Sequence, residues 1–92
     1  MDPKEILKQV KDPEIGQNIV DLGLIYRVDM EGKHAKILMT LTTPMCPAGG
    51  FIMNEVERVL TENGLTSEIE LTFEPPWSPD MIDKNLRRKL GI

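Results

Sequence analysis

One cysteine, Cys46, is the only thiol that this sequence offers for nucleophilic or metal-binding chemistry. Pro47 follows it directly, and proline is favoured at the first position of a helix. We therefore expect Cys46 to be the N-cap of a helix, where free backbone N–H groups and the positive end of the helix dipole surround its sulfur. Such surroundings stabilise a thiolate and lower the pKa of the thiol. A small, buried and inert cysteine at a helix start is the alternative interpretation.

The sequence supplies few partners for this thiol. A cysteine nucleophile needs a base, usually a histidine. The only histidine, His34, begins the strand that we expect to end at Thr42, about 20 Å away at about 3.3 Å per residue. Hydrolytic chemistry within one chain is therefore not expected, and we predict that the protein is not an enzyme. One thiolate also cannot complete a cluster or zinc site, so any iron at Cys46 would be shared with a partner and held loosely.

The residues on either side of Cys46 are also unusual. Thr42 and Thr43 add hydroxyl groups just before the turn. Gly49 and Gly50 fall in the first turn of the expected helix, where each costs up to about 1 kcal/mol relative to alanine. Their placement predicts a close approach of another group to the backbone at this point.

Two carboxylates beside a proline, Asp12 and Glu14, are further candidates for a role at the site. They lie in a polar loop at residues 12–18. In one interpretation the loop is a turn with solvated carboxylates. In the other, Asp12 or Glu14 is directed at the Cys46 site, where a carboxylate would tune the thiol or supply an oxygen ligand.

Three runs of alternating residues predict the β-strands that would support the site, at about residues 24–30, 34–42 and 68–74. A turn at residues 31–33 joins the first two into a hairpin. The third run carries three glutamates and a threonine on one face, so helices should cover only the other face of the sheet. In the first run we expect Leu24, Tyr26, Val28 and Met30 on one face, and Ile25, Arg27 and Asp29 on the other.

Three helices are expected around these strands. Pro13 ends a short N-terminal helix, a second helix runs from about Pro47 to Glu62, and a third begins with Ser78 as N-cap and Pro79 at its first position. The order α-β-β-α-β-α predicts an α/β two-layer sandwich in which a three-stranded sheet carries helices on one face. The strand that pairs with the third strand stays open. We expect one domain over residues 1–92.

Charge and composition restrict the possible partners. The chain has 92 residues, of which 40% are hydrophobic and 28% are charged, as is ordinary for a folded soluble protein. Its net charge of −4 argues against nucleic acid as a partner. No stretch approaches the roughly 20 apolar residues of a membrane span, and the first residues lack the apolar run of a secretory signal. We therefore expect a cytoplasmic protein without nucleic-acid or membrane partners.

A second unusual stretch is Glu-Pro-Pro-Trp-Ser-Pro at residues 74–79. In one interpretation it is a rigid connector whose Trp77 covers an edge of the core. In the other it is a docking surface for a partner, because a stiff proline segment and an aromatic side chain form a low-entropy anchor.

Four segments in the same order form a recognisable set: Asp12-Pro13-Glu14, residues 19–25 (Ile-Val-Asp-Leu-Gly-Leu-Ile), residues 42–47 (Thr-Thr-Pro-Met-Cys-Pro) and residues 75–79 (Pro-Pro-Trp-Ser-Pro). In these segments the chain resembles the PaaD/SufT-like family of iron–sulfur cluster assembly domains. The resemblance implies a fold like that of the NifU C-terminal domain, and a role in maturing or delivering iron–sulfur clusters to client proteins. The chain lacks the Cys-x-x-Cys pair of NifU-type scaffolds, so scaffold activity is not implied.

The resemblance places the family's functional residues on Asp12, Glu14, Thr43 and Cys46, which are the candidate cofactor-binding residues, with Cys46 as the metal ligand. We predict an accessory factor in iron–sulfur cluster assembly or transfer that binds iron or a labile cluster shared with a partner chain. Its partners would be client or scaffold proteins, and a homodimer would supply a second thiolate. The alternative is a non-catalytic interaction module in a multiprotein complex, including an accessory subunit for a ring-oxygenating enzyme, in which Cys46 is structural.

Overall fold

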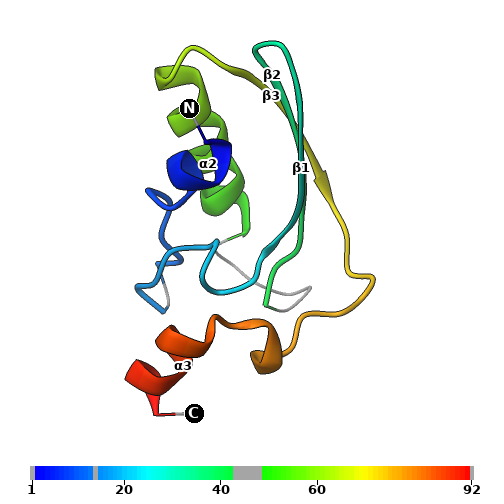
Figure 1. Ribbon diagram of the computed structural model, residues 1–92. Helices are drawn as coiled ribbons and strands as arrows, with labels where there is room; N and C mark the ends of the chain where they lie inside the picture. The colour runs from blue at the N-terminus through cyan, green and yellow to red at the C-terminus, as the bar shows by residue number, and fades with distance from the viewer. Residues whose placement is uncertain (1, 14, 43–48, 92) are drawn as a thin grey trace.

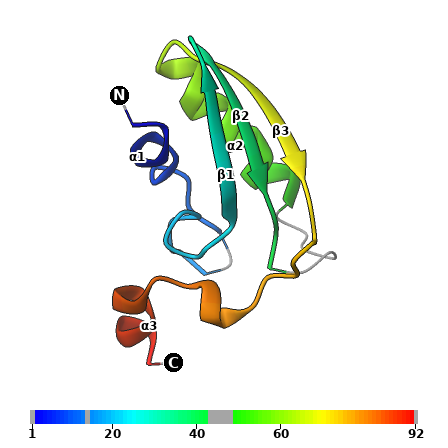
Figure 2. The ribbon, with the colours of Figure 1, turned by 45° about the vertical axis from the view of Figure 1, so that its right-hand side comes forward.

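The protein forms a three-stranded sheet with two helices on one of its faces, and the computed structural model describes residues 2–13, 15–42 and 49–91. Helices α1 and α2 lie on the same side of the sheet, and α3 lies beyond one end of both layers (Figures 1 and 2). This confirms the expected order α-β-β-α-β-α. The elements are α1 (Pro3–Leu7), β1 (Ile25–Glu31), β2 (His34–Met39), α2 (Gly49–Glu62), β3 (Thr66–Leu71), the 3-10 helix η1 (Pro79–Met81) and α3 (Lys84–Leu90).

Strands β1 and β2 form the expected antiparallel hairpin, with Glu31 opposite His34 beside the turn. The register shifts between Ile25 and Arg27, so that Tyr26 is an extra residue in β1. A bulge of this kind reverses the alternation of side chains on one side of it. Ile25 consequently lies opposite the buried Met39 and against the core, and the predicted face shared by Ile25, Arg27 and Asp29 is wrong at Ile25.

The third strand pairs with the second, which the sequence left open. Strands β2 and β3 are parallel, with Ile37 opposite Ile69 and Met39 opposite Leu71. Helix α2 provides the crossover between them, as a parallel connection requires. The sheet order is therefore β1-β2-β3, and both outer strands have one side without a neighbouring strand in the described part of the chain.

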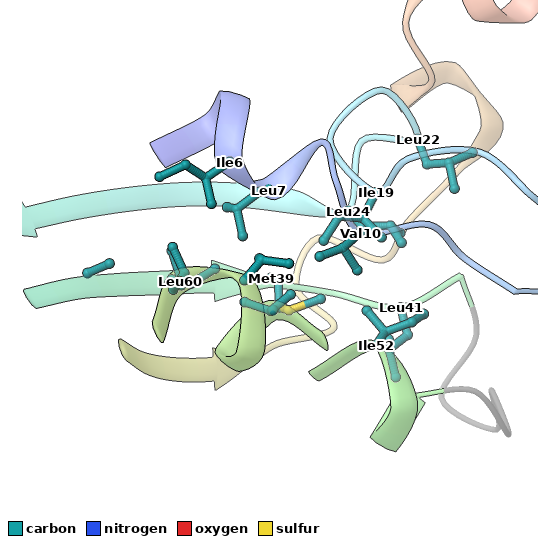
Figure 3. Packing of buried hydrophobic residues seen from close by; sticks show 14 of the residues in the cluster. Ile6, Leu7, Val10, Ile19, Leu22, Leu24, Met39, Leu41, Ile52 and Leu60 are labelled. Atoms are coloured by element: carbon teal, nitrogen blue, oxygen red, sulfur yellow. The ribbon is translucent and has the colours of Figure 1, made fainter. Parts of the chain in front are cut away.

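The hydrophobic core fills the space between the sheet and the two helices (Figure 3). The apolar stripe predicted for α2 is correct, because Ile52, Val56, Val59 and Leu60 are all buried. On the opposite, solvent-facing side of α2, Arg58 donates hydrogen bonds to Glu55 and Glu62, which raise the pKa of the guanidinium.

The C-terminal helix differs most from its prediction. Pro79 begins only a short 3-10 helix, and the chain is extended at Ile82 before α3 begins. Asp83 caps α3 by accepting a hydrogen bond from the Asn85 N–H at 3.0 Å, whereas Ser78 makes no capping bond. The break has a tertiary cause, because the Asp83 N–H donates to the Asp21 carbonyl at 2.8 Å.

The strand ends also shift from the expected positions. Strand β2 ends at Met39, although the next N–H, that of Thr40, still donates to the Leu24 carbonyl just before β1. Strand β3 begins at Thr66, whose N–H donates to the Lys33 carbonyl in the hairpin turn. None of the helices in the described part of the chain has the length and apolarity that a membrane crossing requires.

Candidate functional site

Three of the four predicted site residues lie outside the described residues. They are Glu14, Thr43 and Cys46. The expectation that Cys46 is the N-cap of the second helix lies outside them too. Asp12 is described, and so are the two ends of the chain that frame residues 43–48, namely the end of β2 with Leu41 and the start of α2 at Gly49.

The two ends that frame residues 43–48 are in direct contact. Gly49 is buried, and a Cβ atom added to it would lie 2.8 Å from Cδ1 of Leu41, whose side chain is itself buried. Glycine allows the start of α2 to approach the end of β2 this closely. The predicted close approach to the backbone is therefore found at Gly49, while a Cβ on Gly50 would meet no described atom within 4 Å.

Burial and hydrogen bonds hold the chain in place at Thr40, just after the end of β2. Thr40 is fully buried, its N–H donates to the Leu24 carbonyl at 2.8 Å, and its hydroxyl donates to the Leu41 carbonyl at 3.4 Å. On the helix side, Ile52 is fully buried in the first turns of α2. The segment that carries the cysteine is thus held at both ends by the core.

Asp12 is buried, with 2% of its surface exposed. Its N–H donates to the Gln17 carbonyl at 2.9 Å, and its own carbonyl accepts from the Gly16 N–H at 2.7 Å. Its carboxylate accepts from the Ile15 N–H at 3.4 Å. A buried carboxylate is costly unless it is hydrogen-bonded, and the tight loop supplies such a bond. The interpretation of a solvated carboxylate is therefore wrong for Asp12.

The loop that holds Asp12 is anchored on the same core as the cysteine segment. Val10 and Ile19 flank this loop, and the Ile19 N–H donates to the Val10 carbonyl at 3.0 Å. Both side chains belong to the buried cluster that also contains Leu41 and Ile52. Figure 3 labels all four within this cluster. One rigid core therefore supports the Asp12 loop and both ends of the cysteine segment.

The C-terminal segment docks on the loop at residues 18–24. The indole N–H of Trp77 donates to the carbonyl of the buried Leu22 at 2.7 Å. A Cβ on Gly23 would lie only 2.3 Å from the Met81 carbonyl oxygen, and Gly23 has a φ of +78°, which favours glycine. Two of the four segments of the sequence signature, residues 19–25 and 75–79, thus contact each other.

These contacts favour one interpretation of the Pro-Pro-Trp stretch. Trp77 is half-buried against the core, and its only hydrogen-bonding group is used within the chain. The Tyr26 hydroxyl donates to the Pro75 carbonyl at 2.7 Å and holds the same stretch from the bulge in β1. The geometry supports the connector interpretation rather than a docking surface centred on this indole.

The described residues contain no group of three or more His, Cys, Asp or Glu side chains that could hold a metal ion. His34 is a half-buried residue at the start of β2, and its Nδ1 lies 2.7 Å from the Thr66 hydroxyl. This contact places the histidine at the far end of β2 from residues 40–42. It agrees with the expected position of His34 at the start of this strand, at the opposite end from Thr42.

Sequence reasoning missed two surface features. Phe51 lies in the first turn of α2 and is 51% exposed. The uncovered face of the sheet also forms a shallow charged hollow, lined by Arg27, Asp29, Lys36, Leu38, Glu68 and Glu70. The alternating glutamates of the third run are the sequence signal for this face, and alternation alone predicts only that the face is exposed to solvent.

Residues 4–72 match the family model of an iron–sulfur cluster assembly protein. The chain belongs to this family. Over 90 residues, 95% of this chain and 86% of the relative, it is 43% identical to an Fe-S protein maturation auxiliary factor of Porphyromonas gingivalis. The crystal structure of a DUF59 domain from Bacillus anthracis superposes with a TM-score of 0.92 at 36% identity, covering 98% of this chain and 89% of that one.

A third relative places the family segment in a longer protein. The iron–sulfur cluster carrier protein of Deinococcus radiodurans is 34% identical over 67 residues, which are 73% of this chain but 19% of the carrier. The family assignment confirms the resemblance to iron–sulfur assembly domains. Residues 4–72 include three of the four signature segments, whereas the docked stretch at residues 75–79 lies outside the family match.

Proposed function

We propose that this protein is an accessory factor in iron–sulfur cluster assembly or transfer, and that the thiolate of Cys46 contacts the iron or the cluster. Membership of the assembly family carries the proposal, since both the family description and the matched relatives concern iron–sulfur maturation. Cys46 is the only thiol in the chain. We propose that the protein acts in the cytoplasm. We also propose that it does not catalyse a substrate reaction.

The framework around residues 43–48 supports this role for the thiol. The contact of Leu41 with Gly49 holds the two ends of the segment together. A segment whose two ends are held together has fewer conformations to lose when it binds than one with free ends. In this proposal Thr43 positions the segment, while Asp12 and Glu14 tune the thiol or supply an oxygen ligand.

The iron or cluster is cargo in this proposal. One thiolate satisfies only part of the coordination that an iron–sulfur cluster needs, so the remaining ligands must come from a partner chain, a second copy or a small thiol. Incomplete coordination by this chain favours release to the next protein. Phe51, exposed in the first turn of α2, would add apolar contact with a partner beside the segment.

We propose that the partners are iron–sulfur carrier, scaffold or client proteins. In the carrier of Deinococcus radiodurans, a segment similar to this chain occupies 19% of a longer protein. A segment joined to a carrier acts at a high effective concentration, whereas a separate chain must bind its partner.

The test is cluster transfer under anaerobic conditions. The protein is reconstituted with iron and sulfide and mixed with an apo enzyme whose activity returns when a cluster is inserted. Wild-type protein should accelerate the return of activity. Cys46→Ala and Cys46→Ser should reduce the rate to that of a mixture without this protein, because both variants remove the thiolate.

His34→Ala is the matched control for this experiment, because it removes a potential iron ligand at the far end of β2. We expect it to retain the wild-type rate. Circular dichroism of each variant establishes that the fold is intact. Equal client activation by the wild type and Cys46→Ala would contradict the role given to the thiol.

A further inference from the structure

The outer edge of β3 is an exposed and regular strand edge. Strand β3 is the last strand of the described sheet, and its pairing with β2 runs without a shift over all six residues. The other outer strand, β1, contains the bulge at Tyr26. Bulges discourage pairing at a strand edge, whereas a straight edge is a template for an additional strand. Of the two edges, β3 is therefore the one suited to accept another chain.

The backbone groups that face outward from β3 can be assigned from its pairing. The N–H groups of Thr66 and Thr72 donate to carbonyls of Lys33 and Met39, on the side of β2. Backbone groups alternate in direction along a strand. The N–H and C=O groups of Ser67, Ile69 and Leu71 therefore point away from β2, where the described chain places no further strand.

The two faces of β3 have different chemistry at this edge. Glu68 and Glu70 lie on the uncovered face of the sheet, in the charged hollow. Ile69 and Leu71 lie on the helix-covered face, opposite the buried Ile37 and Met39. Leu71 nevertheless exposes 38% of its surface, because the sheet ends beside it. An added strand would cover Leu71 on one face and meet the glutamates on the other.

On the uncovered face of the sheet, the two cations of the described residues form ion pairs, whereas two of the carboxylates do not. Arg27 pairs with Asp29 at 2.8 Å, and Lys36 pairs with Glu31 at 3.5 Å. Within the described residues, the carboxylates of Glu68 and Glu70 make neither an ion pair nor a hydrogen bond. Lys36 lies opposite Glu68 in the sheet, but its ammonium group pairs with Glu31, and beyond Glu68 and Glu70 the described part of the face has no cation before the free edge. The complementary partner is cationic at the positions adjacent to Glu68 and Glu70.

A second copy of this chain is disfavoured at the same edge when the two β3 strands pair over their full length. If two β3 strands paired about a two-fold axis through Ile69, Glu68 of each copy would lie opposite Glu70 of the other. Like charges directly opposite in a sheet are destabilising. The glutamates that attract a basic strand therefore also oppose self-association of the edge.

We propose that the outer edge of β3 binds an extended segment of a partner protein in which basic and apolar residues alternate. The segment adds a fourth strand to the sheet through the outward backbone groups of Ser67, Ile69 and Leu71. Its lysine or arginine side chains lie beside Glu68 and Glu70, and its apolar side chains cover Leu71. Main-chain bonds provide the affinity of such additions, and alternate side chains provide the specificity.

The probe for this proposal is a short blocked peptide in which lysine and valine alternate, and it requires no iron. Amide hydrogen exchange of the full chain, measured by NMR, reports the edge directly. With peptide at about ten times its Kd, exchange of the Ser67, Ile69 and Leu71 amides should slow by about tenfold, because exchange then requires release of the peptide. A peptide with the same residues but all lysines at one end should protect these amides far less.

Charge reversal at the edge provides the second measurement. Glu68→Lys combined with Glu70→Lys should weaken peptide binding by about tenfold or more, because the new lysines repel the probe. The control is Glu57→Lys combined with Asp80→Lys, which changes the net charge equally at exposed positions outside β3. At physiological salt, where charges are screened beyond about 8 Å, the control should retain the wild-type affinity.

Three results would overturn the proposal. They are an unchanged exchange rate of the three outward amides with peptide present, an equal loss of affinity in the two charge-reversal proteins, and dimerisation of the wild type through β3 without peptide. Each is independent of cluster transfer by Cys46, so failure of this inference and failure of the proposed function are distinguishable.

Discussion

Gly23 shows how a single residue controls the docking of the C-terminal segment. Its φ of +78° favours glycine, and the Met81 carbonyl oxygen lies where its Cβ would be. The sequence contains Gly23 within a recognised segment, yet it gives no sign that the neighbour is a residue 58 positions later in the chain. A local pattern predicts a turn glycine, but only the tertiary structure reveals the close approach.

We therefore predict unequal effects for two glycine substitutions with the same backbone strain. Gly64 also has a φ of +78°, but a Cβ there would meet no described atom within 4 Å. Gly64→Ala should lower the free energy of unfolding by about 1–2 kcal/mol, the cost of a left-handed conformation. Gly23→Ala should lower it by about 1–3 kcal/mol more, because the Met81 backbone must move. Urea unfolding followed by far-ultraviolet circular dichroism measures both, and equal losses would contradict the close approach.

The candidate site shows the limit of sequence reasoning at the residue scale. The roles of Glu14, Thr43 and Cys46 stay predictions, because these residues lie outside the described part of the chain. For Asp12, turn chemistry correctly predicted the loop. Its burial was not predictable, because the burial follows from packing of Val10 and Ile19 into a core assembled from distant segments.

At the scale of elements, periodicity identified the helices and strands but not all of their ends. The apolar stripe of α2 and the hairpin of β1 with β2 follow from local patterns. The bulge in β1 and the break between η1 and α3 do not. Tyr26 donates to Pro75, and the Asp83 N–H donates to Asp21, so contacts between distant residues accompany both irregularities. The sequence could not show these contacts.

Two capping substitutions distinguish the predicted helix start from the observed one. Asp83→Ala should lower the free energy of unfolding by about 1 kcal/mol, because it removes the acceptor for the Asn85 N–H at the start of α3. Ser78→Ala should change it by less than about 0.5 kcal/mol, because Ser78 makes no capping bond. Thermal unfolding of both variants measures the difference. A larger loss for Ser78→Ala would favour a single helix that begins at Pro79.

At the scale of the whole molecule, the C-terminal segment adds contacts to the fold beyond residue 72, where the family match ends. Beyond this point the chain contributes Trp77 to the loop at residues 18–24, and it adds the buried Ile82 and Leu86 to the core. The two-layer arrangement was predictable from element order. The packing of η1 and α3 against the end of the sandwich was not predictable from this order.

A chain that ends after Thr72 should therefore be much less stable. Burial of Ile82 and Leu86 contributes about 1.5–3 kcal/mol for each side chain, and the bond to the Leu22 carbonyl contributes about 1 kcal/mol. These losses are comparable with the 5–15 kcal/mol that stabilises a typical domain. Circular dichroism during urea unfolding measures the loss. A chain that ends after Asp83 keeps Trp77 and Ile82 and should be of intermediate stability, whereas full stability of the shortest chain would contradict the structure.

The position of Trp77 has a practical consequence for spectroscopy. It is the only tryptophan in the chain, and its indole is bonded to the loop at residues 18–24 rather than placed at the centre of the core. Intrinsic fluorescence therefore reports mainly on whether the C-terminal segment is attached. Detachment of this segment alone would shift the emission spectrum while the sheet and α2 remain folded. An emission change without a matching change in helical signal would thus mark a partly opened molecule, and not a denatured one.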